Sequence, residues 1–384
     1  MKTSLGSLAA LTACGERRRG SVESEHQESE APGARELEGR HLTPVRVASD
    51  LEVRSIVGLR PYRPSGFVVR REEWGQKSLI HNYGHGGGGI SLSWGCAHLA
   101  TELAGAVAGQ PCAVIGGGVM GLSTARLLQL RGARVTLYTK ALPPETTSNI
   151  AGGQWWPVSV YDYRRRTEAF ARQFIEAAKF SHRYFQNLVG PRWGVRWIPN
   201  YYLSERAPQN GWMGGPGGVL HDLQVGFRDF GPDEHVFPSN YVRRFYSMLI
   251  EPATYLNTLM SEVLGAGGRL EIRDFSTTAE IERLPEKLIF NCTGLGAKAL
   301  FSDAELIAAR GQLSVLMPQP TVNYNLISDY FYMFPRTDGV ILGGTFERGN
   351  EDLRPSPTSR ERILQAHNRL FTEMARRISA ASEL

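Results

Sequence analysis

The sequence has few cysteines and no long apolar run, and both features exclude classes of protein. Only four cysteines occur among 384 residues, with no spacing typical of a zinc site or a disulfide framework. Three of them, Cys96, Cys112 and Cys292, lie in apolar surroundings, so we expect small buried hydrophobic residues there. No stretch approaches the length of a transmembrane helix.

The sequence also lacks a basic patch. The formal net charge is +5, and the basic residues are nearly all arginines that stand singly rather than among aromatic residues. This pattern does not favour nucleic-acid binding. Hydrophobic residues make up 42% of the chain, so a large core is expected, and the length allows two domains or one large two-lobed domain.

The first 44 residues differ in composition from the rest. A lysine, a short apolar stretch and small residues precede Cys14, which is typical of a secretion signal, and LTAC resembles a bacterial lipoprotein cleavage box with Cys14 as the lipidated residue. The charged segment that follows is typical of a disordered tether. An irregular N-terminus with a chance cysteine explains these residues equally well, so an envelope location and a cytoplasmic one both stay open.

Residues 112–138 have the pattern of a βαβ unit. An apolar strand at Cys112–Ile115 leads into a glycine turn and a helix at Met120–Leu130, which Gly132 ends. A second strand follows at Val135–Tyr138. In this setting a glycine motif indicates a dinucleotide-binding turn.

The motif is GxGxxG, formed by Gly116, Gly118 and Gly121. The first glycine allows the tight turn, the second lets the backbone approach a pyrophosphate, and the third lets the helix pack on the strand. The helix N-terminus would then bind the diphosphate. Lys140 stands where an acidic residue usually binds the ribose, so we expect ribose recognition through Glu145, through the backbone, or in a different manner.

Four consecutive glycines, Gly86–Gly89, stand between a short strand and apolar residues at helical spacing. The apolar positions are Leu92, Cys96, Leu99, Leu103 and Val107. The N–H groups at such a helix start form a positive pole, which would stabilise the negative charge of a reduced flavin. We therefore interpret the run as a flavin platform. The alternatives are a metal site at His81 and His85, which lacks a third ligand nearby, and a glycine-rich structural loop.

The second half of the chain alternates further strands, turns and helices. Residues 155–245, rich in Trp, Tyr, Pro and Gly, predict a lobe of sheet and loops. Residues 251–272 predict a helix followed by a strand, and residues 287–300 a strand that enters a glycine-rich turn. Thr358 and Glu361 predict a capping box. It would open a last helix whose core face is Ile363, Leu364, Leu370, Phe371 and Met374.

Seven motifs together resemble the D-amino-acid oxidases, a family that includes the D-aspartate oxidases. They are VGLRPYRP, IHNYGHGGGGISLSWG, VIGGGVMGLSTA, TTSNIAGG, NCTGLGAKAL, RGQLSVL and LGGTFERGN, and the similarity extends from about Val45 to Met374. In that family the GxGxxG strand comes first and the first two motifs come last. The order here resembles a circular permutation, with the old ends joined near Val107 by AGQP; a scrambled gene model gives the same order.

The resemblance implies an α/β fold of two lobes, a Rossmann-like FAD-binding lobe and a mostly β substrate lobe. After the leader and tether at 1–44, we expect the FAD-binding lobe at 45–154 and 246–312, with its C-terminal helix at 350–384. The substrate lobe is expected at 155–245 and 313–349, the second part including a lid.

The resemblance also implies the site. Arg60 would bind the substrate carboxylate in a two-pronged geometry, unless it is a surface ion pair. Tyr332 would donate a second hydrogen bond, the Gly87 carbonyl would accept one from the amine, and Tyr330 or Ser328 would lie on the lid. FAD is expected at Gly116, Gly118, Val119, Met120, Gly121, Thr147, Ser148, Gly152, Gly153, Gln154, Thr293, Gly86, Gly87, Gly88, Gly89, Ile90 and Ser91. No metal is expected.

The implied reaction is hydride transfer from a D-amino acid with a neutral amine to flavin N5, without a catalytic base. The imino acid hydrolyses to a 2-oxo acid and ammonia, and dioxygen reoxidises the flavin to give hydrogen peroxide.

The implied substrates are mainly neutral D-amino acids. Phe346, and a position near Asn325, stand where the D-aspartate oxidases carry arginines, so an acidic side chain would lack its counter-charge. Gln154 and Trp156 are expected in the pocket wall. Alternatives are a flavin amine oxidase acting on glycine, secondary amines or D-aspartate, a non-catalytic flavin-binding protein tethered to the envelope, and an NAD-linked dehydrogenase.

Overall fold

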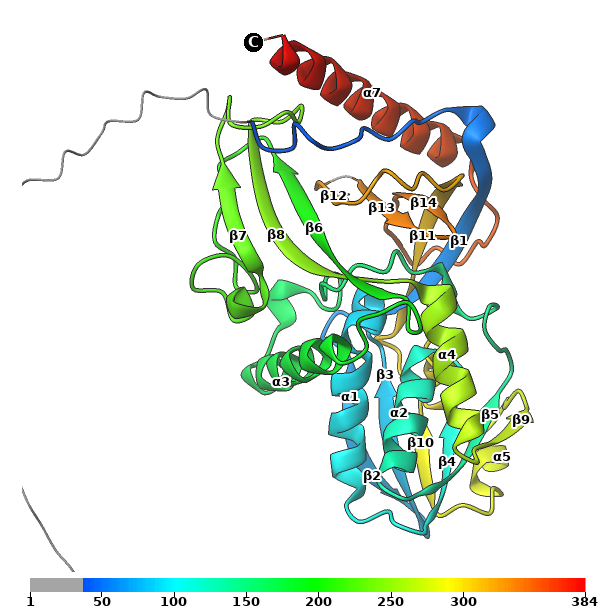
Figure 1. Cartoon of the computed structure of the whole chain (residues 1–384). Coiled ribbons are helices and arrows are strands. Elements are labelled where there is room, and N and C mark those ends of the chain that lie inside the picture. Colours follow the sequence, from blue (N-terminus) through cyan, green and yellow to red (C-terminus); the bar gives the residue numbers. More distant parts are fainter. Residues whose placement is uncertain (1–36, 330, 384) are drawn as a thin grey trace, which may run out of the picture. The chain divides into compact units, whose positions relative to one another are not determined.

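Two β-sheets with helices packed on them organise the described residues of the computed structural model, 37–329 and 331–383 (Figure 1). Residues from Leu37 onward form one compact unit. The predicted leader and tether lie outside the described residues as far as residue 36, as do the lipidation site Cys14 and the lid residue Tyr330. The last part of the predicted tether, residues 37–44, is instead ordered on the compact unit, because Glu38 pairs with Arg244 at 2.8 Å and Leu37 and Leu42 pack against a buried apolar cluster. The predicted α/β fold class is confirmed.

The first sheet has six strands and a mostly parallel order. Its strands are, in spatial order, β2 (Val68–Trp74), β3 (Lys77–Tyr83), β10 (Leu288–Asn291), β4 (Pro111–Ile115), β5 (Arg134–Thr139) and β9 (Arg269–Ile272). Only the β2–β3 pair is antiparallel. Every residue of β10 is buried, as expected for an apolar strand in a parallel sheet covered on both faces.

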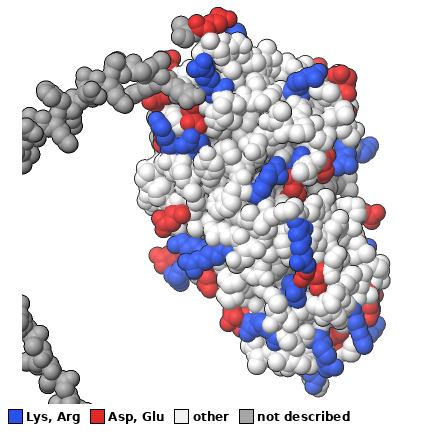
Figure 2. Space-filling model, in the orientation of Figure 1, with Lys and Arg blue, Asp and Glu red and all other residues white. Residues whose placement is uncertain are grey.

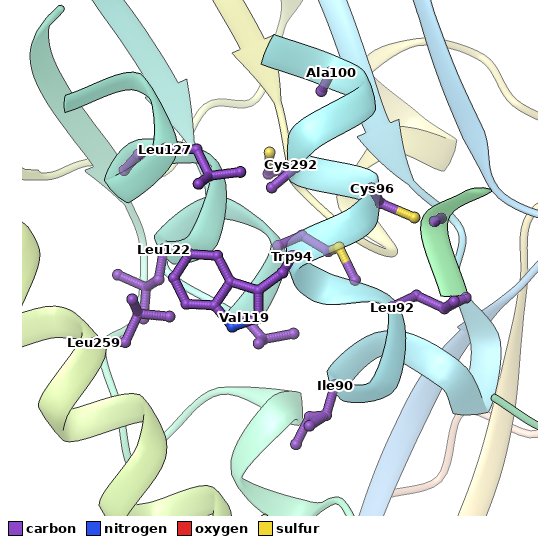
Figure 3. Packing of buried hydrophobic residues seen from close by; sticks show 14 of the residues in the cluster. Ile90, Leu92, Trp94, Cys96, Ala100, Val119, Leu122, Leu127, Leu259 and Cys292 are labelled. Atoms are coloured by element: carbon purple, nitrogen blue, oxygen red, sulfur yellow. The ribbon is translucent and has the colours of Figure 1, made fainter. Parts of the chain in front are cut away.

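Helices cover this sheet. On one face lie α1 (Gly89–Ala104), α2 (Val119–Leu130) and α4 (Pro252–Gly265), and α3 (Glu168–Gln186) packs against α1. Leu122 of α2, Leu259 of α4 and Trp94 of α1 share one apolar core (Figure 3). The shorter helices are α5 (Thr278–Glu282) and α6 (Gly296–Leu300). The predicted βαβ unit is confirmed, and Gly132 adopts a left-handed φ of 83° just after α2.

The second sheet has nine strands. Its main path runs β1 (Glu52–Tyr62), β11 (Ile307–Leu316), β14 (Gly339–Gly343), β13 (Tyr332–Arg336), β12 (Asn325–Ile327), β6 (Val195–Ser204), β8 (Tyr241–Ile250) and β7 (Val225–Phe230), while β15 (Glu347–Arg348) pairs with β11. Helix α7 (Pro357–Ser382) covers one face and buries the five predicted core residues. Short 3₁₀ helices occur at Ser49–Leu51, Gly86–Gly88, Thr147–Ile150, Tyr163–Arg165 and His221–Leu223.

Three local predictions differ from the structure. The capping box at Thr358 and Glu361 is wrong, because α7 begins at Pro357 and its N-cap is Ser356, whose side chain accepts from the Ser359 N–H. Residues 155–245 contain a long helix, α3, as well as sheet and loops. Helix α7, expected with the FAD-binding lobe, packs on the nine-stranded sheet because its apolar face meets β11 and β14. The lobe boundaries themselves stay a prediction.

The remaining global features concern thiols, charge and hydropathy. Cys96, Cys112 and Cys292 are buried free thiols, as expected, and burial raises the pKa of Cys112 to about 11. Lys and Arg lie among Asp and Glu on the face shown in Figure 2. In the part of the chain that the structure describes, every helix is too short or too polar to cross a membrane.

Candidate active site

A cavity of about 2270 Å³ opens at the carboxyl ends of the parallel strands. Residues at or just beyond the carboxyl ends of β3, β4, β5 and β10 line it, and they include Gly86, Gly116, Thr139 and Thr293. Strand β4 lies between β10 and β5. The chain continues from β4 to β5 on one side, and β10 adjoins β4 on the other side. Ligands bind at such a switch point in open α/β sheets, which makes this cavity the candidate site.

The GxGxxG turn has the geometry that its glycines predict. Gly116 adopts a φ of 119°, and a β-carbon at Gly121 would overlap the Gly116 carbonyl oxygen. Gly121 therefore lets α2 pack close to the turn, as predicted. Thr139 of β5, which sequence reasoning missed, accepts from the Gly117 N–H at 2.9 Å, and Ser148 accepts from the Val119 N–H at 3.1 Å. These hydroxyl groups hold the turn open at the N-terminus of α2.

The four-glycine run faces both the cavity and the protein. Gly86, Gly87 and Gly89 line the cavity at the start of α1, but a β-carbon at Gly86 would overlap the carbonyl oxygen of Ser159. A β-carbon at Gly88 would lie 2.5 Å from Val160. The absence of side chains at Gly86–Gly88 is thus explained by close packing on residues 158–160. Only part of the run is therefore open to a ligand, and the structural-loop alternative accounts for the rest.

Arg60 of β1 and Tyr332 of β13 both line the cavity. The Arg60 guanidinium donates to the Thr345 carbonyl at 3.3 Å and lies 5.6 Å from the Phe346 ring centroid. No carboxylate of the described residues lies within 4.0 Å of it, so the predicted alternative, an ion pair, is not formed there. A half-buried guanidinium without an internal counter-charge has the chemistry to bind an anionic ligand.

The cavity wall beside them carries an amide chain. Gln154 donates to Asn200 Oδ1 at 2.8 Å, and Asn325 donates to the same oxygen at 2.9 Å. Asn200 in turn donates to the Ile198 carbonyl, which fixes the direction of the three amides. Gln154 lines the cavity, whereas Asn325 is fully buried and contributes nothing to its surface.

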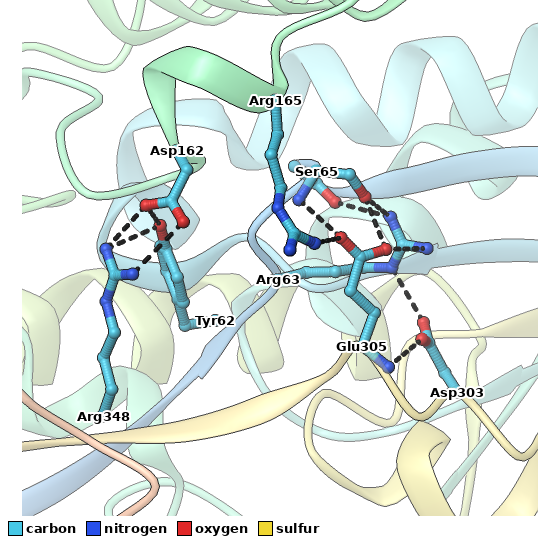
Figure 4. A network of polar contacts seen from close by, with 9 residues as sticks. Tyr62, Arg63, Ser65, Asp162, Arg165, Asp303, Glu305 and Arg348 are labelled. Atoms are coloured by element: carbon cyan, nitrogen blue, oxygen red, sulfur yellow. Dashed lines mark hydrogen bonds and ion pairs between the residues drawn. The ribbon is translucent and has the colours of Figure 1, made fainter.

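A polar cluster holds the segment that backs the glycine run (Figure 4). The Tyr62 hydroxyl donates to Asp162 at 2.6 Å, and Arg348 donates to the same carboxylate at 2.7 Å. These bonds from Arg348 and Tyr62 hold the pKa of Asp162 below its usual value. Ser159, three residues away, adopts a φ of 55°, unusual for a residue with a side chain, and accepts from the Gly87 N–H at 2.9 Å. Sequence reasoning missed this cluster because its members are distant along the chain.

The two histidines of the glycine-run motif are engaged separately. His81 lies 3.2 Å from Glu72 and 2.9 Å from Asn291, while His85 stacks on Phe67 at 5.0 Å. Burial lowers the pKa of both, to about 3 for His85. Among the described residues no group of three or more His, Cys, Asp or Glu side chains is placed to hold a metal ion.

Most of the predicted site residues meet at this one cavity. Its lining includes Arg60, Tyr332, Gly86, Gly87, Gly89, Ile90, Ser91, Gly116, Gly118, Val119, Met120, Thr147, Ser148, Gly152, Gly153, Gln154, Thr293, Ser328, Trp156, Lys140 and Glu145. Gly88 and Gly121 pack behind the lining against protein atoms instead.

The residues present fit FAD. The cavity exceeds the roughly 300–1,000 Å³ of ordinary small-ligand pockets, and two helix N-termini, those of α1 and α2, reach its wall. Each is a positive pole, so one suits a diphosphate and the other a flavin ring that becomes anionic on reduction. A β-carbon at Gly118 would approach only the Ser148 hydroxyl, at 3.3 Å, which leaves its backbone accessible.

Comparison with known proteins agrees with this geometry. The family model described as DAO, FAD dependent oxidoreductase, matches residues 12–103 and 112–382. The D-amino-acid oxidase of Rubrobacter xylanophilus is 30% identical over 259 residues, covering 66% of this chain and 74% of that protein. The D-amino-acid oxidase of Streptomyces coelicolor is 31% identical over 270 residues, covering 68% and 78%.

Among solved structures, iminodiacetate oxidase from Chelativorans sp. BNC1 is similar with a TM-score of 0.50 and 15% identity, over 69% of this chain and 79% of that one. At this identity the similarity concerns the fold alone. The cavity, its two helix N-termini and the family match together show that the chain belongs to the FAD-dependent oxidoreductases of the D-amino-acid oxidase family, and that FAD is its cofactor.

Proposed function

We propose that the protein oxidatively deaminates mainly neutral D-amino acids to 2-oxo acids, ammonia and hydrogen peroxide. The observation that carries the proposal is Arg60, a guanidinium without an internal carboxylate partner in the described chain, at the same cavity as the glycine run and Tyr332. A guanidinium and a phenol hydroxyl together suit a carboxylate. Two of the curated relatives are D-amino-acid oxidases.

The chain's residues would act chiefly by binding and orientation. Arg60 and Tyr332 hold the carboxylate, and the Gly87 carbonyl accepts from the amine on the opposite side. Leu313 and Phe334 form an apolar wall that limits water near the substrate. FAD, held along the two glycine turns, supplies the acceptor for the hydride and the later reaction with dioxygen.

The side-chain preference follows from Phe346 and Asn325. Phe346 offers an apolar ring at the cavity, and Asn325 is buried against Asn200, so neither position supplies a cation to a substrate side chain. Arg310 on the neighbouring strand is already paired with Glu347 at 2.9 Å. An acidic side chain would have to be desolvated without a counter-charge, which favours neutral substrates.

The test is hydrogen peroxide production by the purified, FAD-loaded protein. We expect peroxide from D-alanine or D-valine, little from L-alanine, and a weaker rate with D-aspartate. Arg60→Ala should lower kcat/KM for D-alanine by about 30- to 4,000-fold, since removing one partner of a buried charge pair costs roughly 2–5 kcal/mol. Peroxide from L-alanine at the D-alanine rate, or an Arg60 variant with unchanged kinetics, contradicts the proposal.

We also propose that the order of elements is a circular permutation of the family's. Strands β3 and β4 both pair with β10, so the two glycine stretches meet at one site although their order is exchanged. The link between α1 and β4 is short and mostly exposed, and the two segments matched by the family model lie on either side of residues 104–111. A chain cut in this link and rejoined from residue 383 to residue 45 should fold and bind FAD; failure of a correctly ordered chain to do so contradicts the proposal.

A further inference from the structure

We propose that Gly311 and Gly343 are positioning residues for carboxylate binding, because their missing side chains let Arg60 and Tyr332 lie across the sheet toward each other. The inference rests on the proposed function, since it takes Arg60 and Tyr332 as the carboxylate-binding pair.

The strand register places these four residues on one face. Strands β1, β11, β14 and β13 are consecutive neighbours, so Arg60 and Tyr332 stand on the two outer strands and the glycines on the two inner ones. Tyr332 pairs directly with Gly343, and Leu313 with Gly343 on the other side. Side chains two residues apart in a strand share a face, so Gly311 points to the same side as Leu313.

On β1, Gly58 pairs with Gly311, and Arg60 follows two residues later on the same face. Neighbouring strands lie about 4.8 Å apart, so groups on the outer two of four strands begin roughly 14 Å apart. Arg60 and Tyr332 must therefore extend over the inner strands to bind one carboxylate together.

The inner strands leave room for this only because they carry glycine. A β-carbon at Gly311 would overlap Arg60 Nη1 and lie 2.6 Å from its Cζ. A β-carbon at Gly343 would overlap the Tyr332 ring and lie 2.7 Å from its Cε1. The guanidinium and the phenol ring thus occupy the space of the two absent side chains.

Both side chains then reach neighbouring residues of one segment. The Tyr332 hydroxyl lies 3.2 Å from the position of a β-carbon at Gly344, and Arg60 donates to the carbonyl of Thr345, the next residue. Thr345 is itself fixed to β11, because its hydroxyl accepts from the Gln312 N–H at 2.9 Å. Both donors therefore reach the Gly344–Thr345 segment, and a carboxylate bound between them there would accept from both.

Neither Gly311 nor Gly343 has a positive φ, so the left-handed region does not account for either glycine. Glycine inside a strand weakens it and often marks a close approach by another group. The group that approaches here is the carboxylate-binding pair itself.

Gly311→Ala is the sharper variant, because the group that it displaces is the far end of a flexible side chain. We expect the fold to remain and the guanidinium to move. Gly58→Ala is the matched control: Gly58 pairs with Gly311 and also lines the cavity, but the three heavy atoms nearest to its β-carbon would belong to the Ile150 side chain, at 3.0 Å or more, and not to Arg60.

The experiment measures the affinities of the FAD-loaded protein for benzoate, a carboxylate without an amine, and for benzamide, its uncharged counterpart. Wild type and Gly58→Ala should prefer benzoate, and Gly311→Ala should lose at least tenfold of that preference with an unchanged unfolding midpoint. In an Arg60→Ala background, Gly311→Ala should have no further effect on the preference. A role in sheet packing alone would weaken both ligands equally.

The outcomes separate the two proposals. If wild type shows no preference for benzoate, or Arg60→Ala keeps it, the proposed function fails and the inference falls with it. If Arg60→Ala loses the preference and Gly311→Ala keeps it, the inference alone is wrong. If Gly311→Ala does not fold, Arg60→Ala/Gly311→Ala decides: recovery of folding supports overlap with the guanidinium, and continued misfolding contradicts it.

Discussion

Removing the Asp162 carboxylate should disturb the glycine run, Gly86–Gly89, indirectly through Ser159. Asp162 accepts from Tyr62 at 2.6 Å and from Arg348 at 2.7 Å, and it fixes the end of the segment that carries Ser159. Ser159 holds a left-handed φ of 55°, which costs roughly 1–2 kcal/mol and persists only under such restraint. In Asp162→Ala we expect Ser159 to relax toward an ordinary φ and its carbonyl to leave the Gly87 N–H.

The magnitude follows from the bonds that are lost. Each hydrogen bond to a charged group contributes about 1.5–3 kcal/mol when buried, but Asp162 and Arg348 are 31% and 48% exposed, so we expect a loss of unfolding free energy of about 1–2 kcal/mol in all. Loss of the Gly87 bond, worth about 1 kcal/mol, should weaken substrate and FAD binding by roughly fivefold.

Urea unfolding, FAD titration and peroxide kinetics measure these effects. Arg165→Ala is the matched control, because Arg165 belongs to the same segment and pairs with Glu305 at 3.3 Å, yet it is 60% exposed. It should change stability by less than about 0.5 kcal/mol and leave kinetics unaltered. If Asp162→Ala is destabilised as stated but binds FAD and substrate like Arg165→Ala, the coupling of this carboxylate to the glycine run is refuted.

Three further predictions concern specificity, packing and pH. Phe346→Arg should raise kcat/KM for D-aspartate relative to D-alanine by at least tenfold, because it adds a cation at the cavity; an unchanged ratio in the peroxide assay would contradict the placement of substrate side chains near this ring. Gly121→Ala should lower the free energy of unfolding by about 1–3 kcal/mol, since its β-carbon would overlap the Gly116 carbonyl, whereas Gly118→Ala should cost less in the same urea experiment. Burial alone would raise the pKa of Asp303, but hydrogen bonds from Tyr83 and Arg63 outweigh it and hold the pKa below its usual value, so the stability that this carboxylate contributes is present above about pH 4 and is lost as the pH falls further. In Asp303→Asn the unfolding midpoint should therefore decrease less steeply below pH 4 than in the wild type. An equally steep decrease would show that other carboxylates determine the acid dependence of stability.

The sequence predicted the parts of the fold that depend on local pattern. The βαβ unit could be found because strand, glycine turn and helix are contiguous, and the apolar spacing from Leu92 onward marks α1. Helix α3 was missed because Ala and Ser form much of its buried face, although Phe170, Phe174 and Phe185 follow a helical spacing. The start of α7 was also readable, from Ser356 followed by Pro357.

The candidate site was predicted only in part, because much of it depends on contacts between distant residues. The sequence around Gly86 does not indicate that Ser159 packs against this glycine, or that Asp162 holds Ser159 in place. For Gly311 the sequence gives only a weak indication, a glycine within an otherwise strand-like segment. Its neighbour across the sheet could be identified only from the register of β1 and β11.

The central place of β10 has a consequence for how the chain folds during synthesis. Residues 77–139 contain β3, α1, β4, α2 and β5 and leave the ribosome one after another. Strands β3 and β4 do not pair with each other, because β10 (Leu288–Asn291) lies between them and pairs with both. In the nascent chain the position between β3 and β4 therefore stays unfilled until the four residues of β10 have been synthesised. In ribosome-bound chains that stop before Leu288, β3 and β4 should be sensitive to proteases. In chains that extend past Gly296, β10 should pair with both strands and protect them.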